Sequence, residues 1–228
     1  MLQQELALYD IYQQQIAKCD RQIEQCLTNF APQTQEPPPP RPGKRRKKPP
    51  GNEPHFDLHG HLYRMTGVDF TVIDGLNVLS VQTIISEVGL DPTRFPTVKH
   101  FTSWLGLCPG SRITGGKVKS SQTRQVVNRA ANAFRIAAQA LSRSNSALGA
   151  FYRRLRGRLG APKAITATAH KLARMFYRLG TTRQAYCDPG ADYYEQQYRE
   201  RMVNNLKKKA QSLGFELVAQ PEVTEGVS

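Results

Sequence analysis

Residues 73–89 read IDGLNVLSVQTIISEVG, the pattern of a tight turn followed by a helix. The turn covers Ile73 to Asn77 and contains a glycine, which accepts backbone conformations closed to other residues. Apolar residues then recur at the spacing of one helix face, at Val78, Val81, Ile84, Ile85 and Val88. Gly89 stands where such a helix would end. With its neighbours, this segment predicts a mainly α fold.

A second short helix is expected before the turn, from about Leu62. Two short helices joined by a turn with glycine can expose backbone N–H groups beside a helix N-terminus, where an anion binds. This arrangement resembles a helix-hairpin-helix, which grips DNA backbone without reading bases. Many structural helix pairs also have a glycine in the turn, so the two interpretations stay open. Gly75 is thus one candidate contact for a phosphate.

The charge of the chain is strongly one-sided. From Pro92 to Cys187 it carries 18 Lys and Arg but no Asp or Glu. An ordinary surface mixes both signs of charge, and a one-sided surface repels itself unless a polyanion neutralises it. Nucleic acid does so with a gain from counterion release. The same stretch cannot supply a carboxylate metal site or a carboxylate acid–base pair, so any chemistry there must use hydroxyls, Lys, Arg or His.

The whole chain of 228 residues has a net charge of +14. No apolar run approaches the ~20 residues that a membrane span needs. The N-terminus lacks the features of a signal peptide, so we expect a cytoplasmic protein without a membrane partner. The cysteines form no Cys-x-x-Cys pair, which fits a reducing compartment and disfavours zinc; they are Cys19, Cys26, Cys108 and Cys187.

Residues 3–30 predict one amphipathic helix. Its apolar positions alternate at steps of three and four, the a/d pattern of a coiled coil, at Tyr9, Tyr12, Ile16, Cys19, Ile23, Cys26 and Phe30. Such a helix would join copies of the chain into a homo-oligomer. Because the pattern spans only about four heptads, packing onto the chain's own core is an equal alternative.

Residues 31–58 are expected to form a linker. Pro37 to Pro40 make its first part stiff and extended. A basic arm follows, which either binds phosphates or serves as a solubilising tether: Arg41, Lys44, Arg45, Arg46, Lys47 and Lys48. His55, His59 and His61 cluster at the linker exit, but no fourth ligand or scaffold is evident there, so no metal site is predicted.

The segment from Cys108 to Ser121 reads CPGSRITGGKVKSS and predicts a loop dense in hydroxyls, glycines and cations. Glycines allow a phosphate to approach the backbone closely. Lys117 and Lys119 would neutralise that phosphate, and a hydroxyl beside them could attack phosphorus if activated. No general base is evident nearby, so the residues alone favour simple phosphate binding.

Basic helices follow this loop. Three apolar stripes are predicted, namely Val127, Ala130, Phe134, Ala137 and Leu141; Leu148, Phe151, Leu155 and Leu159; and Ile165, Ala169, Leu172, Phe176 and Leu179 after Pro162. The cations and glycines predicted to contact nucleic acid, besides Gly75, are Arg112, Gly115, Gly116, Lys117, Lys119, Arg124, Arg135, Arg153, Arg154, Arg156, Arg158 and Lys171. His170 could act as a base or bind a phosphate, but it is a weaker candidate, since a lone helical His is more often structural.

Acidic residues return from Asp188, where we expect a helix up to Ser212 and a short strand over Phe215 to Val218. The tail from Pro221 is expected to be disordered. The predicted organisation is a coiled-coil helix over 1–30, a Pro-rich basic linker over 31–58, a helical domain over 59–183, a C-terminal helix and extension over 184–220, and a tail over 221–228.

Taken in order, several of these features resemble the C-terminal half of insertion-sequence-110 transposases, the bridge-RNA-guided DNA recombinases of bacterial mobile elements. They are the turn over 73–77, the run from Ser86 to Gly89, the segment from Phe95 to Leu107, Pro109, and the Gly115-Gly116-Lys117 loop before a basic, alanine-rich helix. The resemblance covers roughly residues 60–180. The N-terminal helix resembles the coiled coil that precedes this half.

The resemblance implies a loop hydroxyl that attacks DNA and forms a covalent phosphate intermediate. In the family this is a serine just before a glycine, whereas Thr114 precedes Gly115 here. Ser111, Ser120 and Ser121 are the fallback candidates. The resemblance also implies DNA and a guide (bridge) RNA as partners.

A RuvC-like domain holds Mg²⁺ in the family. Since this chain starts at the coiled coil, that half is expected to come from a separate partner, and no cofactor is expected within this chain. The alternative is a catalytically inactive module or remnant that binds DNA or RNA.

Overall fold

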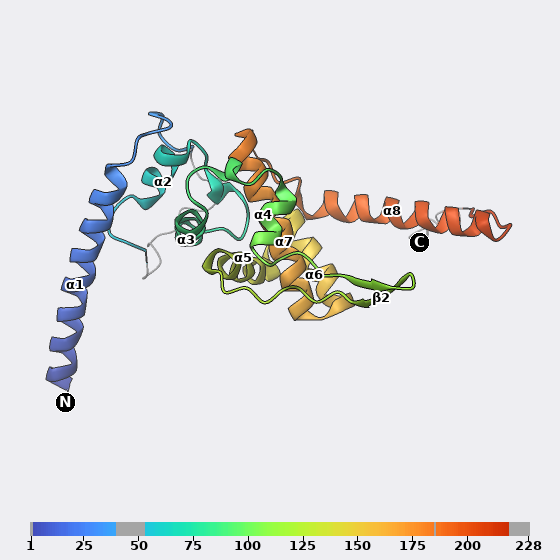
Figure 1. The fold of residues 1–228 in the computed structure, drawn as a ribbon, viewed down its shortest axis with the longest axis horizontal. Coiled ribbons are helices and arrows are strands. Elements are labelled where there is room, and N and C mark those ends of the chain that lie inside the picture. Colours follow the sequence, from blue (N-terminus) through green and yellow to red (C-terminus); the bar gives the residue numbers. More distant parts are fainter. Residues whose placement is uncertain (1, 40–52, 185, 219–228) are drawn as a thin grey trace, which may run out of the picture.

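A computed structural model describes residues 2–39, 53–184 and 186–218. Over these residues the fold is mainly α with one small antiparallel sheet, so the predicted fold class is confirmed (Figure 1). The elements are α1 (Leu2–Thr28), α2 (Leu58–Thr66), the 3₁₀ helix η1 (Phe70–Val72), α3 (Val78–Val88), η2 (Pro92–Arg94), α4 (Val98–Trp104), β1 (Arg112–Thr114), β2 (Lys117–Ser120), α5 (Arg129–Ala140), η3 (Leu141–Arg143), α6 (Ala147–Leu159), α7 (Ala161–Thr182) and α8 (Gly190–Ser212).

The predicted turn and helix at residues 73–89 are confirmed. Asn77 caps α3, since its side-chain oxygen accepts a hydrogen bond of 2.8 Å from the Ser80 N–H. Gly89 ends α3 with a positive φ of 85° and donates its N–H to the Ile85 carbonyl at 2.7 Å. All the predicted inward residues of α3 are buried. Local sequence signals alone fixed both ends of this helix.

The predicted short connection before α3 is wrong. The preceding helix α2 ends at Thr66, and η1 lies between it and the turn, so the two helices are not joined by one tight turn. Gly75 has a φ of 90°, and a Cβ placed there would lie 2.8 Å from the Ala137 carbonyl oxygen. The glycine is therefore needed for close packing of the turn on α5.

The core of the domain lies where α5 and α7 pack together, with α3, α4 and α6 around them. Four phenylalanines meet there: Phe70 stacks on Phe176 at 4.0 Å between ring centroids, and Phe134 meets Phe176 edge-on at 5.7 Å. Phe101 joins them from α4. Small buried alanines let α5 approach its neighbours closely, and they are Ala130, Ala131, Ala133, Ala137 and Ala138.

Two of the predicted apolar stripes need correction. Val127 lies before α5 and is fully exposed, so it is not part of the stripe. On α6, Leu159 is exposed and Phe151 and Leu155 are only half-buried, whereas Tyr152 is buried. The inward face of α6 is rotated because this helix packs against both α7 and α8. The stripe of α7 is confirmed, with Ile165 partly buried and the others buried.

Among the described residues, the contacts of helix α1 with the body lie in its last third, from Asp20 onward. There Arg64 donates hydrogen bonds to the carbonyls of Leu27 at 2.8 Å and Phe30 at 3.1 Å. Along most of α1 the apolar a/d positions, the seam of the predicted coiled coil, are exposed to solvent, with Tyr9 59% and Tyr12 65% exposed. The helix projects away from the body (Figure 1). The alternative that the seam packs on the chain's own core is therefore wrong for the described residues. Its pairing with another helix stays a prediction.

The C-terminal helix α8 is confirmed to Ser212 and docks its first part on α6. The predicted strand over Phe215 to Val218 is wrong, because these residues are exposed and irregular and pair with no strand of the described part of the chain. The predicted basic arm, from Arg41 to Lys48, and the tail from Pro221 lie outside the described residues.

Candidate nucleic-acid interface

The predicted loop over Cys108 to Ser121 is a β-hairpin instead. β1 and β2 are joined by the two residues Gly115 and Gly116, whose φ angles are 57° and 72°. Two successive positive φ angles define the type I′ turn that matches the twist of paired strands, and Gly-Gly suits this turn. A sequence signal for the hairpin was present, because β-branched residues flank this Gly-Gly pair. The glycines therefore have a conformational role independent of any phosphate.

The two faces of the hairpin differ in chemistry. Thr114 is paired with Lys117 across the strands, and Ile113 is paired with Val118 on the opposite face. Ile113 and Val118 are 64% and 62% exposed, so this apolar face covers no core. The other face presents the Thr114 hydroxyl and the Lys117 ammonium next to each other, because cross-strand partners lie on one side of a sheet.

The root of the hairpin is fixed to the body. The Arg124 guanidinium donates hydrogen bonds to the backbone carbonyl and to the hydroxyl of Ser103, both at 3.0 Å. Gly106, with a φ of 65°, lies against Val126, and an added Cβ would come within 2.7 Å of that side chain. Arg124, predicted to contact nucleic acid, is thus engaged in holding the hairpin to the end of α4.

The candidate hydroxyls occupy different places on this arm. Thr114 is exposed at the tip, and its hydroxyl has no hydrogen-bond partner among the described residues. Ser120 accepts a hydrogen bond from the Gln122 N–H at 3.3 Å, while Ser111 and Ser121 are exposed nearer the root. The hairpin contains no carboxylate or imidazole. Thr114 is therefore the candidate hydroxyl that lies at the tip, and the hairpin offers it no carboxylate or imidazole as a general base.

Several predicted cations have no acidic partner within the described ranges. Arg112, Lys117 and Lys119 are exposed on the hairpin, and Arg156 and Arg158 are exposed near the end of α6. Arg135 is half-buried on α5 and is likewise unpaired in those ranges. These side chains keep their charge available, and their contact with nucleic acid stays a prediction.

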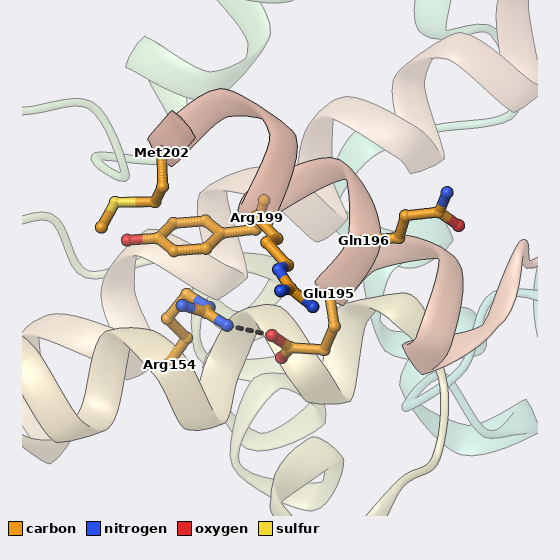
Figure 2. Close-up of a pocket in the computed structure, with 6 residues that line it drawn as sticks. Arg154, Glu195, Gln196, Arg199 and Met202 are labelled. Carbon is orange, nitrogen blue, oxygen red and sulfur yellow. Dashed lines mark hydrogen bonds and ion pairs between the residues drawn. The ribbon is translucent and has the colours of Figure 1, made fainter. Parts of the chain in front are cut away.

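Other predicted cations are held by the chain itself. Arg154 forms an ion pair with Glu195 of α8, and its guanidinium lies 3.5 Å from the centroid of the Tyr198 ring. Figure 2 shows the Arg154 and Glu195 side chains facing each other, with Arg199 and Met202 on the same side of α8. Arg153 donates to the Ser144 carbonyl at 2.6 Å. Glu195 thus supplies an acid that the stretch from Pro92 to Cys187 lacks.

Lys171 of α7 also faces α8. Its ammonium lies 4.3 Å from the Phe151 ring centroid and 5.5 Å from that of Tyr194. Burial, together with the nearby Arg201 and Arg174, lowers the pKa of Lys171. The roles of Glu195, Tyr194 and Tyr198 were missed from the sequence, although the acidic and aromatic residues of α8 were a signal for a partner surface to the basic helices.

The histidine cluster does not converge on one point. The His59 ring lies 3.0 Å from the Asp69 carboxylate and the His61 ring 3.8 Å from Glu24, while the His55 backbone N–H donates to Asp20. In the described part of the chain, no group of three or more His, Cys, Asp or Glu could hold a metal. His170 is half-buried, and burial together with Arg174 lowers its pKa, so it is neutral near pH 7.

Fold and site together define a basic helical domain with an exposed hairpin arm. Residues 70–153 match the family model of the Transposase IS116/IS110/IS902 family, a span from η1 into α6. The match assigns this segment to the C-terminal domain of IS110-family transposases, which belong to insertion sequences, and DNA is the partner that the family implies. No curated protein and no solved structure matches the chain. None of the helices in the described ranges is long and apolar enough to cross a membrane.

Proposed function

We propose that the hairpin tip is the reacting part of this transposase domain and that Thr114 is its nucleophile. The observation that carries the proposal is the cross-strand pair of Thr114 and Lys117 at the Gly115-Gly116 turn. A Cβ placed on either glycine would meet nothing within 4 Å, so the space around the tip is open to a ligand. A phosphodiester lying there would meet a hydroxyl and an ammonium side by side.

In the proposed reaction the Thr114 oxygen forms a bond to a DNA phosphorus atom. The bridging oxygen of the cut strand leaves with its electron pair, and the hydroxyl proton passes to a base outside this hairpin. Lys117 offsets the charge that develops on the phosphoryl oxygens. The covalent threonine–phosphate ester preserves the energy of the broken bond for later strand transfer.

Magnesium does not fit the hairpin, because the acid-free stretch offers no carboxylate oxygen, the ligand that this ion prefers. The family resemblance instead assigns Mg²⁺ to a RuvC-like partner domain, and we propose that the base for the hydroxyl proton also comes from outside this hairpin. We propose that copies of the chain assemble through the bare seam of α1, which would bring such domains and hairpins together. A guide RNA would be a second ligand.

The second candidate function is a module that binds nucleic acid without cutting it. It is favoured by one observation: the Thr114 hydroxyl has no general base beside it within the described residues. The hairpin and the unpaired cations would then only hold DNA or structured RNA. The two candidates differ in whether a covalent protein–DNA bond forms.

The test incubates the full chain with duplex DNA carrying its element's ends, Mg²⁺ and a RuvC-like partner, followed by a denaturing gel. We expect a protein–DNA band that survives denaturation, disappears in Thr114→Ala and persists in Thr114→Ser. Ser111→Ala, Ser120→Ala and Ser121→Ala are matched controls that should keep the band. Salt-sensitive binding without any covalent band would support the second candidate and overturn the first.

A further inference from the structure

A groove lies between the start of α4 and the second half of α7, away from the hairpin. Its walls are the segment Pro96 to Val98 on one side and α7 side chains from Lys171 to Thr181 on the other. The Tyr177 hydroxyl donates a hydrogen bond of 2.7 Å to the Phe95 carbonyl, which ties the first wall to the second. The groove is therefore a fixed feature of the packed body.

The charge of this α4–α7 groove has one sign. Lys171, Arg174 and Arg178 line it from positions i, i+3 and i+7 of α7, which share one helix face. No acidic side chain lines the groove, and none forms an ion pair with these three cations within the described ranges. Arg174 and Arg178 are exposed and have no side-chain hydrogen bond there. Their charges are thus open to a ligand.

Burial and neighbouring cations act together on Lys171 and His170. Burial, then Arg201 and Arg174, lower the pKa of Lys171, and the opposing effect of Asp188 is smaller. His170 beside them also has a lowered pKa, from burial and from Arg174. Like charges held this close destabilise each other's protonated forms. A bound anion would relieve this repulsion.

The dimensions of the cation row favour a chain of phosphates over a single one. Seven residues of helix separate Lys171 from Arg178, a rise of about 10 Å. One strand of B-DNA carries a phosphate for about every 3.4 Å of the duplex axis, so a row of this length can reach more than one phosphate. A free phosphate ion would reach only part of the row, whereas a nucleic-acid backbone would follow it.

We infer that the α4–α7 groove binds the phosphodiester backbone of a nucleic acid, separately from the hairpin tip. The groove begins before α4 and the hairpin leaves after it, so the two lie at opposite ends of this helix. The inference rests on the proposed function only in that the domain handles nucleic acid; it does not require Thr114 to react. Two separate contacts would fix the direction of a bound strand across the body.

The experiment measures equilibrium binding of the full chain to a duplex DNA and to an RNA hairpin over a range of salt concentrations. The test variant is Arg174→Gln/Arg178→Gln. The matched control is Lys207→Gln/Lys208→Gln, which removes the same charge from the exposed distal part of α8. With duplex DNA, we expect the slope of log K against log salt to become shallower by about 1.8 in the test variant, at about 0.9 per lost phosphate contact.

A second variant, Arg174→Lys/Arg178→Lys, keeps both charges and should restore most of the slope. Thermal melting by circular dichroism checks folding, and no change is expected because both arginines are exposed. A loss confined to DNA, confined to RNA, or common to both supports the groove and identifies its ligand. Equal slopes for the test and control variants, or no binding by the unaltered chain, overturn it. The covalent-band assay reports on Thr114 independently, so either proposal can fail alone.

Discussion

The hairpin arm and the α6–α8 contact contain cations of the same acid-free stretch but use them differently. On the hairpin, Arg112, Lys117 and Lys119 face solvent without an acid. At the α6–α8 contact, Arg154 is paired with Glu195, and its guanidinium lies over the Tyr198 ring. The difference shows that an excess of charge in one segment predicts a polyanion only for those cations that the rest of the chain leaves unpaired.

The largest effect is expected from a substitution in the hydrophobic core on which both the hairpin arm and the α6–α8 contact are built. Phe134→Ala deletes a fully buried ring at the centre of the aromatic cluster and should lower the free energy of unfolding by about 3–5 kcal/mol. The hairpin and the α6–α8 contact would then lose order together. Chemical denaturation followed by circular dichroism measures the change. An unaltered midpoint would show that the two regions do not depend on this shared core.

The next largest effect distinguishes Gly75, which is packed against α5, from Gly115, which has no atom near its side-chain position. Gly75→Ala introduces a Cβ against the Ala137 carbonyl at a positive φ, and overpacking alone costs about 1–3 kcal/mol. Gly115→Ala meets no atom within 4 Å, so it carries only the conformational cost, about 1–2 kcal/mol, and only within the hairpin. Thermal melting should therefore fall for Gly75→Ala and stay nearly constant for Gly115→Ala. Equal melting temperatures would contradict this.

A smaller effect on stability comes from releasing Arg154. Glu195→Gln removes a partly exposed ion pair, whose contribution is about 1 kcal/mol or less. With the carboxylate gone, Arg154 becomes available to phosphate, so affinity for duplex DNA should rise while stability barely changes. Glu200→Gln is the matched control, because Glu200 lies on the same helix and forms no ion pair within the described residues. A fall in affinity would show that docked α8 assists binding.

The smallest expected effect is a pH dependence of stability that comes from the hydrogen-bonded carboxylate of Asp69. Burial would raise the pKa of Asp69, but hydrogen bonds from His59 and Thr71 outweigh it and lower the pKa. The stabilisation is therefore present above the ordinary carboxyl pKa and is lost as the pH falls through the lowered one. In Asp69→Asn this part of the acid dependence of the melting temperature should vanish. Retention of the full acid slope would assign it to other carboxylates.

The sequence predicted the parts of the fold that depend on neighbouring residues. The ends of α3 and the stripe of α7 follow from local turn and cap residues and from helical spacing. The rotated face of α6 did not, because it depends on α8, which is distant in sequence. The hairpin was not predicted, because Gly115 and Gly116 were interpreted as positions where a phosphate approaches the backbone and not as the turn between two strands.

The candidate site was predictable in composition and not in arrangement. Thr114, Lys117 and the two glycines were singled out together, and the structure places them at one tip. The prediction that Arg124 and Arg154 contact nucleic acid, which stays untested, did not take account of their partners within the chain. Those partners, Ser103 and Glu195, come from segments that only folding brings near.

The anchored root of the hairpin makes the arm a lever with Thr114 at its far end. Four residue steps of extended chain lead from Gly110, whose N–H donates to the Gln122 carbonyl, to Thr114, a length of about 13 Å. A tilt of about 5° at the root therefore moves the hydroxyl by about 1 Å, an error large enough to slow a displacement reaction about a hundredfold. The two bonds from Arg124 to Ser103 limit this tilt at the root, while only a bound strand can steady the tip. Under the proposed role of Thr114 as nucleophile, the accuracy of its attack would depend on the bound substrate as well as on the fold.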